Sequence, residues 1–286
     1  MTTSHRPVPW LPPVEVPPAE NITGHADADQ MRSARPGDAR VLRSTGTAAV
    51  WHRQGMSPGH PPDPGAPADR PVAAPSTAGV VTGDDVRVAV RWLADRLVDK
   101  PVSAFDAQAG PVRWSCWTTT EHVVDDLLAY ALQLAALPAL AYVPLVGPRG
   151  EGEIAHVDRA AGTAGLVEAL VGGGELLATL AETRPADARA FHPYGVSDAD
   201  GFAAMGVVEV LVHGHDVLLG LTHAPTPFPP GLAARALTRL FPDVGTGPDE
   251  DPDAVLLWAT GRGELPGRPR RTRWRWDASV RADAPG

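Results

Sequence analysis

The sequence of 286 residues has a single cysteine, Cys116, and no excess of basic residues. One cysteine excludes an internal disulfide framework and suits a reducing compartment, so we expect a cytoplasmic protein. The formal net charge of -9 argues against a protein that works mainly by binding nucleic acid, because phosphate recognition needs a positive surface. The hydrophobic content of 43% is enough for a globular core.

The sequence also lacks the pattern of a signal peptide at its amino terminus and a long apolar run free of ionisable residues. The apolar run nearest to membrane length covers residues 202–219. It contains four ionisable side chains, Glu209, His213, His215 and Asp216. Such side chains are rare inside transmembrane helices. We therefore predict no membrane span and no membrane partner.

Residues 1–80 lack phenylalanine and tyrosine and contain 14 of the 31 prolines. A segment of this composition buries too little apolar surface to offset the entropy lost on ordering, so we expect it to be disordered. The alternative is that a wrongly assigned start adds these residues and that the natural chain begins near Val81. Both interpretations place a boundary next to residue 80.

Four segments beyond residue 80 have the apolar spacing of helices. The first has a regular apolar face, made by Val86, Val90, Leu93 and Leu97. The other three are expected at residues 119–137, at residues 165–182 and from about residue 198 through the run 202–219. Three glycines, 172–174, either allow close packing of the third helix or break it. Short connections favour a four-helix bundle over residues 81–222.

Residues 223–286 have a different pattern. A fifth helix is expected at residues 231–240, and an apolar piece follows at residues 254–260. Residues 272–276 alternate in the manner of a terminal strand, and a short extended stretch with a hairpin turn is expected earlier, at residues 142–150. We therefore predict a mainly α protein with a small C-terminal α/β extension.

The strongest indication of function is Glu209, four residues before His213 in an apolar helix. Side chains four apart lie one turn apart on the same face and can converge on one point. An ionised carboxylate in apolar surroundings costs several kcal/mol (order of magnitude) unless a partner neutralises it, and a divalent cation is a strong partner. The pair therefore suggests a metal site.

Two ligands are too few for a tight divalent site, so a third is expected from another helix. We choose His122, near the start of the second helix, because Asp125 and Asp126 follow it and could accept from its other ring nitrogen. One oxygen and two nitrogen ligands suit zinc and leave an open coordination position, as a catalytic metal needs.

The spacing of Glu209 and His213 alone leaves simpler interpretations than a metal site open. A structural hydrogen bond is the more frequent reason for a Glu–His pair at this spacing, and His122 is then a solvated surface residue. Cys116 is interpreted as a packed thiol, because no base is near it in the sequence. The Arg- and Trp-rich tail, residues 262–281, could contact phosphate, but in an acidic protein it is interpreted as an amphipathic strand that closes the fold.

Several motifs together carry a resemblance to a known family. They are Trp114-Ser115-Cys116-Trp117, Glu121-His122-Val123-Val124-Asp125-Asp126-Leu127, Phe191-His192-Pro193-Tyr194-Gly195 and the helix from Glu209 to Asp216. They resemble the uncharacterised actinobacterial relatives of the mycothiol-dependent maleylpyruvate isomerase. The resemblance extends from about Asp84 to Leu221 and implies a DinB-like four-helix bundle.

The resemblance also implies a metal and a chemistry. In that family a histidine of the second helix and a Glu-x-x-x-His helix hold a divalent metal, usually zinc, and the matching positions are His122, Glu209 and His213. Mycothiol, a low-molecular-weight thiol, is the cofactor, so the expected function is that of a thiol-dependent isomerase or S-transferase acting on a small electrophilic substrate. The alternative is a metal-binding or stress-associated helical protein without catalytic activity.

Overall fold

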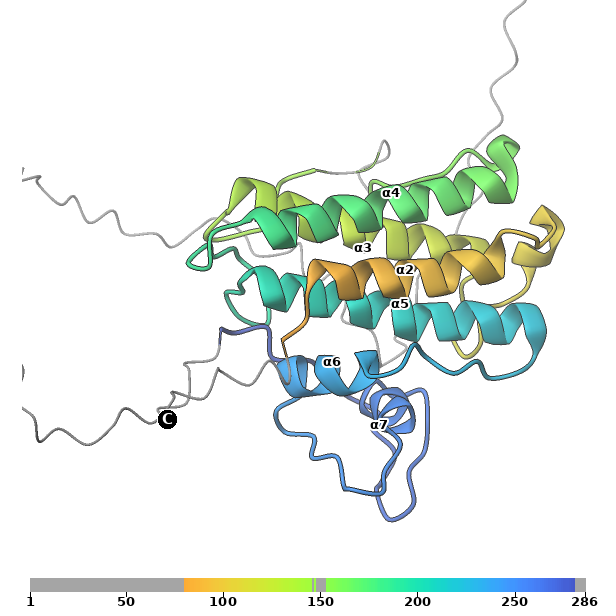
Figure 1. Cartoon of the computed structure of the whole chain (residues 1–286). Coiled ribbons are helices and arrows are strands. Elements are labelled where there is room, and N and C mark those ends of the chain that lie inside the picture. The colour runs from red at the N-terminus through yellow and green to blue at the C-terminus, as the bar shows by residue number, and fades with distance from the viewer. Residues whose placement is uncertain (1–79, 146, 148–152, 281–286) are drawn as a thin grey trace, which may run out of the picture.

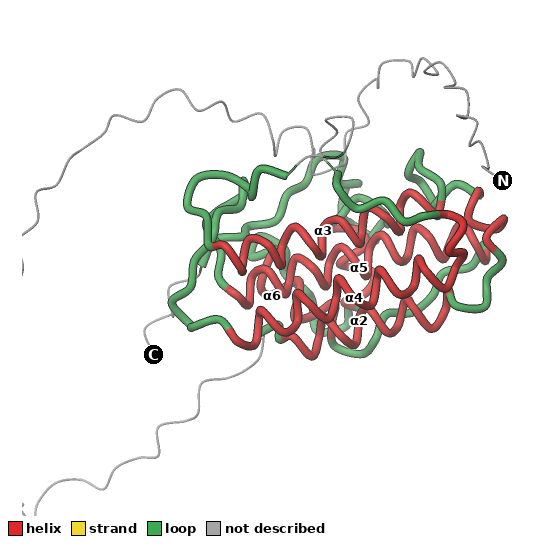
Figure 2. Tube along the Cα trace, turned by 90° about the horizontal axis from the view of Figure 1, so that it is seen from above, coloured by secondary structure: helices red, strands yellow, loops and turns green. Residues whose placement is uncertain are grey.

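The computed structural model describes residues 80–145, 147 and 153–280. The two interpretations of residues 1–80 concern residues outside this range, apart from Val80. Within it, the protein is mainly α and has six α-helices that pack together. Four long helices lie side by side: α2 (Gly83–Leu97), α3 (Cys116–Ala136), α4 (Gly162–Thr183) and α5 (Ala199–Thr222) (Figure 1, Figure 2). Two 3-10 turns, Val102–Asp106 and Arg159–Ala161, precede α3 and α4.

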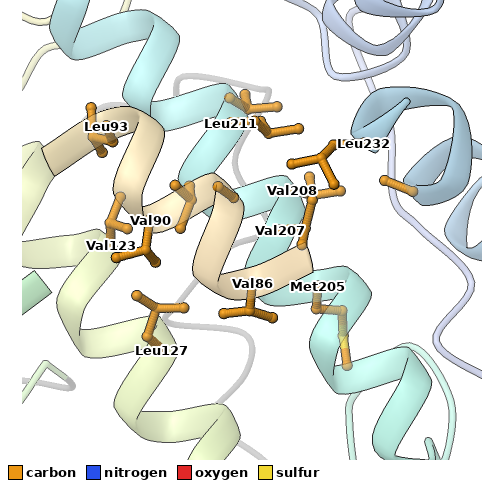
Figure 3. Packing of buried hydrophobic residues seen from close by; sticks show 14 of the residues in the cluster. Val86, Val90, Leu93, Val123, Leu127, Met205, Val207, Val208, Leu211 and Leu232 are labelled. Atoms are coloured by element: carbon orange, nitrogen blue, oxygen red, sulfur yellow. The ribbon is translucent and has the colours of Figure 1, made fainter. Parts of the chain in front are cut away.

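The packing of the long helices brings α3 and α5 together. Both α2 and α3 pack against α4 and against α5. The shorter helix α6 (Leu232–Leu240) then packs on α5, and α7 (Pro252–Ala259) packs on α6 (Figure 1). The core between α2, α3 and α5 is made of aliphatic side chains, among them Val90, Val123 and Val208 (Figure 3).

The helix starts follow from their capping residues. Thr82 caps α2 in a reciprocal arrangement with Asp85, and the predicted apolar face of this helix is buried. Helix α3 begins at Cys116, three residues before the expected start, because Ser115 accepts the N–H of Thr118 and caps the helix there. Asp198 caps α5 in the same way.

The three consecutive glycines do not break α4. Gly174 allows close packing, since a Cβ there would lie 2.5 Å from Cγ2 of Val90 on α2. Gly172 has open space around its Cβ direction. Of the two alternatives for this stretch, close packing is therefore the one that the structure supports.

The predicted strands are wrong for the described residues, which contain no strand. Residues 142–145 are irregular, and residues 148–150 of the expected hairpin lie outside the described residues. Residues 272–276 keep the predicted alternation, with Trp276 buried and Arg275 exposed. A strand needs a partner, however, and the backbone just beyond this segment bonds to a helix end and a loop, from Asp277 to Leu240 and from Ala278 to Tyr194. Residues 223–280 are therefore α and irregular rather than α/β.

Two helical stretches are long and apolar enough, by length and composition alone, to cross a membrane: Arg159–Thr183 and Ala199–Thr222. The sequence analysis considered only the run within the second of them. The apolar window of the second is 94% buried inside the protein, and that of the first is 33% buried. Length and composition do not distinguish a core helix from a span, so the absence of a membrane partner stays a prediction.

Candidate metal centre

The three predicted side chains converge. His122 from α3 and Glu209 and His213 from α5 each offer a ligand atom, and these atoms all lie within 4.8 Å of one another. The Oε2 atom of Glu209 is 3.5 Å from Nε2 of His213, close to the separation of two ligands that share an ion at about 2.1 Å. The rings of His122 and His213 meet edge to face, with centroids 5.1 Å apart. Packing of α3 on α5 thus brings together residues 87 positions apart, the distance from His122 to Glu209.

Helix α5 places Glu209 and His213 in the most enclosed part of the molecule. Every residue from Gly201 to Leu218 is buried, so the pair is shielded from solvent. Burial raises the pKa of Glu209 and lowers the pKa of His213 to about 3, because the charged form of each loses its hydration. His213 is consequently neutral at physiological pH, as a metal-ligating imidazole must be.

His122 is not a solvated surface residue, and that alternative is wrong. Its side chain is 12% exposed, and both ring nitrogens face carboxylates: Nε2 is 3.2 Å from Asp126 and Nδ1 is 2.8 Å from Glu153. Burial lowers the pKa of a histidine, but Asp126, Glu153 and Glu209 outweigh it and raise the pKa of His122 to about 10.

Of the two aspartates expected to support His122, only Asp126 does so. Asp125 instead accepts the backbone N–H groups of Ile154 and Ala155 at 2.7 and 2.8 Å. This fixes the segment that carries Glu153 beside α3. The sequence did not indicate Glu153 as a partner of His122, because the two residues are 31 positions apart and no local pattern connects them.

Glu209 and His213 each have a further partner that the sequence did not reveal. The hydroxyl of Tyr130, buried on α3, donates to Oε1 of Glu209 at 3.2 Å. Nδ1 of His213 lies 3.3 Å from Asp216, whose carboxylate pairs with Arg262 at 3.2 Å. These partners leave Oε2 of Glu209 and Nε2 of His213 facing each other.

Asp216 and Arg262 therefore belong to the site, and Arg262 is not part of a terminal strand. Burial opposes ionisation of Asp216, but His213 and Arg262 outweigh it and lower its pKa. His215, two positions after His213, lies outside the group, with its ring 6.2 Å from that of Phe228.

The site carries an excess of negative charge. Four carboxylates lie within 3.5 Å of the two histidine rings, those of Asp126, Glu153, Glu209 and Asp216, and none of them is more than 25% exposed. Arg262 is the guanidinium paired with this group. Without a metal, His122 carries a proton and burial raises the pKa of Asp126 and of Glu209, so part of this charge is offset. With all four carboxylates ionised and both imidazoles neutral, as ligation of a metal requires, one fixed positive charge leaves an excess of three negative charges. A divalent cation would reduce this excess to one, so the residues fit such an ion in donor type and in charge.

Cys116 does not belong to the site. It is fully buried, its Sγ lies 3.5 Å from the carbonyl of Val217, and burial raises the pKa of its thiol to about 11. The interpretation as a packed thiol is confirmed.

Comparisons of the chain with protein families, with curated proteins and with solved structures find no match. The resemblance to relatives of the maleylpyruvate isomerase is therefore carried by the sequence motifs alone. The chain is a helical protein with a largely buried group, His122, Glu209 and His213, that could hold a metal ion.

Proposed function

We propose that the protein binds one divalent metal, zinc by preference, through His122, Glu209 and His213, and that it uses this metal to activate a low-molecular-weight thiol, mycothiol, for an isomerase or S-transferase reaction. The observation that carries the proposal is the convergence of three ligand atoms of the zinc-preferred types within 4.8 Å. Three protein ligands leave a coordination position for the thiol.

The fold is consistent with this proposal. Four long helices lie side by side as in the DinB-like bundle that the motifs imply, and the ligands come from the second and fourth of them (Figure 1). We propose residues 81–222 as that bundle and residues 223–286 as an extension that contributes Arg262 to the site. A cytoplasmic location, with no nucleic-acid or membrane partner, belongs to the same proposal.

The chain's own residues would hold and orient the ligands. The carboxylate of Asp216 lies 3.3 Å from Nδ1 of His213 and so favours the proton on that nitrogen, which leaves Nε2 to bind the metal. Tyr130 occupies one oxygen of Glu209 and leaves the other to the metal. When bound, a divalent metal lowers the pKa of a thiol that reaches it.

The nucleophile of such a reaction would come from outside the chain. Cys116 is buried with a raised pKa and is the chain's single thiol. An external thiolate can add to an electron-poor double bond of a small substrate, and it can leave again after rotation about the resulting single bond. The thiol and a small electrophile are therefore the proposed partners.

A non-catalytic metal-binding or stress-associated protein is the second candidate. The observation that favours it is the enclosure of the group: the side chains of His122, Glu209 and His213 are between 8 and 12% exposed, and both nitrogens of His122 have carboxylate neighbours. A structural metal would be held in the same way, with its fourth position closed to ligands.

Thiol binding to the cobalt-substituted protein separates the two candidates. We expect added mycothiol to change the visible bands of bound cobalt and to add a thiolate charge-transfer band. The Cys116→Ala variant should respond equally, which shows that the signal comes from the added thiol. A cobalt spectrum that does not respond to mycothiol would contradict the catalytic proposal and leave the structural one.

A further inference from the structure

A second cleft lies away from the candidate metal centre, along the C-terminal segment. It has a volume of about 920 Å³ and is formed by residues 193–195, 242–243 and most of 271–279. None of the metal-centre residues lines it. Its size is that of clefts that take small organic ligands.

The cleft is lined by arginines in an otherwise acidic protein. Arg273 and Arg275 are exposed, and neither forms an ion pair with any residue that the structure describes. They alternate with Trp274 and Trp276 along the sequence, and both arginines line the cleft. Arg271 is already paired with Asp243 at 2.9 Å. Two free guanidinium groups favour carboxylate or phosphate, which they bind through paired hydrogen bonds.

Aromatic rings form the inner wall. The rings of Trp274 and Trp276 are 5.8 Å apart, and that of Tyr194 lies 6.3 Å from Trp276. Indole and phenol rings give a flat ligand a large contact area at low entropic cost. The wall therefore favours a planar group over a bare inorganic ion.

Three buried N–H groups of this wall lack acceptors among the described residues. The Nε1 atoms of Trp274 and Trp276 and the Nε2 atom of His192 have no hydrogen-bond partner there. His192 lies behind Trp276, with ring centroids 5.9 Å apart, and its Nδ1 accepts the N–H of Tyr194, so Nε2 carries the proton of the neutral ring. These atoms are enclosed, and His192 does not line the cleft, so the contacts available to a ligand are those of the exposed arginines and the half-buried rings.

We propose that this cleft binds a planar organic anion, with Arg273 and Arg275 holding its carboxylate or phosphate group and the half-buried rings of Tyr194 and Trp274 contacting its flat body. The cleft shares no lining residue with the metal centre, although the guanidinium of Arg262 lies 5.9 Å from the ring centroid of Trp274. The proposal does not depend on the thiol chemistry. Carboxylate and phosphate share the chemistry that the two guanidinium groups recognise, and the choice of probe distinguishes them.

Calorimetric titration of the full chain in the presence of a chelator tests the proposal without interference from metal. Benzoate and adenosine monophosphate represent a ring with a carboxylate and a ring with a phosphate. Acetate and inorganic phosphate supply the anion alone, and benzamide supplies the ring alone. We expect at least one ring anion to bind about tenfold or more tightly than the matching bare anion and than benzamide. Binding of benzoate identifies a carboxylate site, and binding of adenosine monophosphate a phosphate site.

The double variant Arg273→Ala/Arg275→Ala should weaken that binding by about tenfold or more, since it removes both charge-assisted contacts. A matched control is Arg91→Ala/Arg113→Ala, which removes the same charge from exposed positions outside the cleft and should bind as the wild type does. The proposal is overturned if neither ring anion binds, if bare anions bind as tightly, or if the cleft variant keeps full affinity.

Discussion

Glu209 introduces a carboxylate into the most buried helix of the molecule, beside three other carboxylates and one guanidinium. The variant Glu209→Gln should lose metal binding, because a neutral amide is a poor ligand and one of three donors is gone. In the metal-free state it should be more stable than the wild type, by on the order of 1 kcal/mol, since the excess of buried negative charge falls. Urea unfolding with chelator and metal analysis without it measure the two effects.

The control for this prediction is Glu168→Gln, which removes the same charge from an exposed position on α4. It should keep the metal and change stability little. Retention of a full equivalent of metal by Glu209→Gln would show that this carboxylate is not a ligand.

Tyr130 is a positioning residue for Glu209, because it donates to the oxygen that does not face His213. The variant Tyr130→Phe keeps the ring in its packed place and removes only the hydroxyl. We expect about a tenfold loss of metal affinity, as is usual for partners that orient a ligand. A competition titration against a zinc indicator measures this loss, and the unfolding midpoint of the metal-free variant reports any packing defect separately. Unchanged affinity would exclude the positioning role.

The sequence alone predicted part of this site. Glu209 and His213 followed from helical spacing, and His122 from its place near the start of the second helix and then from the family motif. Three further residues of the group lie far along the chain from their partners: Tyr130 is 79 positions from Glu209, Glu153 is 31 from His122, and Arg262 is 46 from Asp216. Only the packing of helices and loops brings them to the site. Asp216 was within reach of the sequence, three residues after His213, and could have been identified from helical spacing.

Helix α4 shows how single positions decide the packing of an element. Gly172→Ala should stabilise the protein by about 1 kcal/mol, because alanine is the better helix former and the position is open. Gly174→Ala should destabilise it, because the new Cβ would lie 2.5 Å from Val90. Chemical denaturation of the matched pair measures both signs. Equal effects of the two substitutions would contradict the close approach of α2 and α4.

Among the secondary-structure elements, the predicted helices agree with the structure and the predicted strands do not. A helix makes its hydrogen bonds within one segment, so the face from Val86 to Leu97 and the cap at Asp198 are visible locally. A strand needs a second segment, and alternation in residues 272–276 gives no information about a partner.

The whole molecule has one continuous core, to which the residues after α5 contribute. Arg239 on α6 pairs with Asp198 and Asp200 at the start of α5, and Trp276 is 2% exposed against His192. These contacts place His192 in the interior, where burial lowers its pKa from the ordinary 6.5 to about 3.

Folding stability should therefore fall in acid. Below about pH 6.5 the unfolded chain takes up a proton at His192 that the folded protein does not bind until about pH 3. The contribution of this residue is full above pH 6.5 and decreases towards pH 3, by up to about 1.4 kcal/mol per pH unit.

The variant His192→Phe should show a shallower loss of stability across this interval. Urea unfolding of both proteins from pH 7 to pH 4, with chelator present, compares the slopes. His223→Asn changes an exposed histidine at a helix end and should leave the slope as in the wild type. Equal slopes for wild type and His192→Phe would mean that His192 is not buried as a neutral ring.

The central claim is that a single divalent ion binds where α3 and α5 meet, and elemental analysis tests it most directly. The full chain, purified after growth with added zinc and dialysed, should contain about one equivalent of metal, because three-ligand sites bind tightly. The Glu209→Gln variant prepared in parallel should contain almost none. Less than about 0.1 equivalent in the wild type would contradict the account, since a site of this kind retains its ion through dialysis.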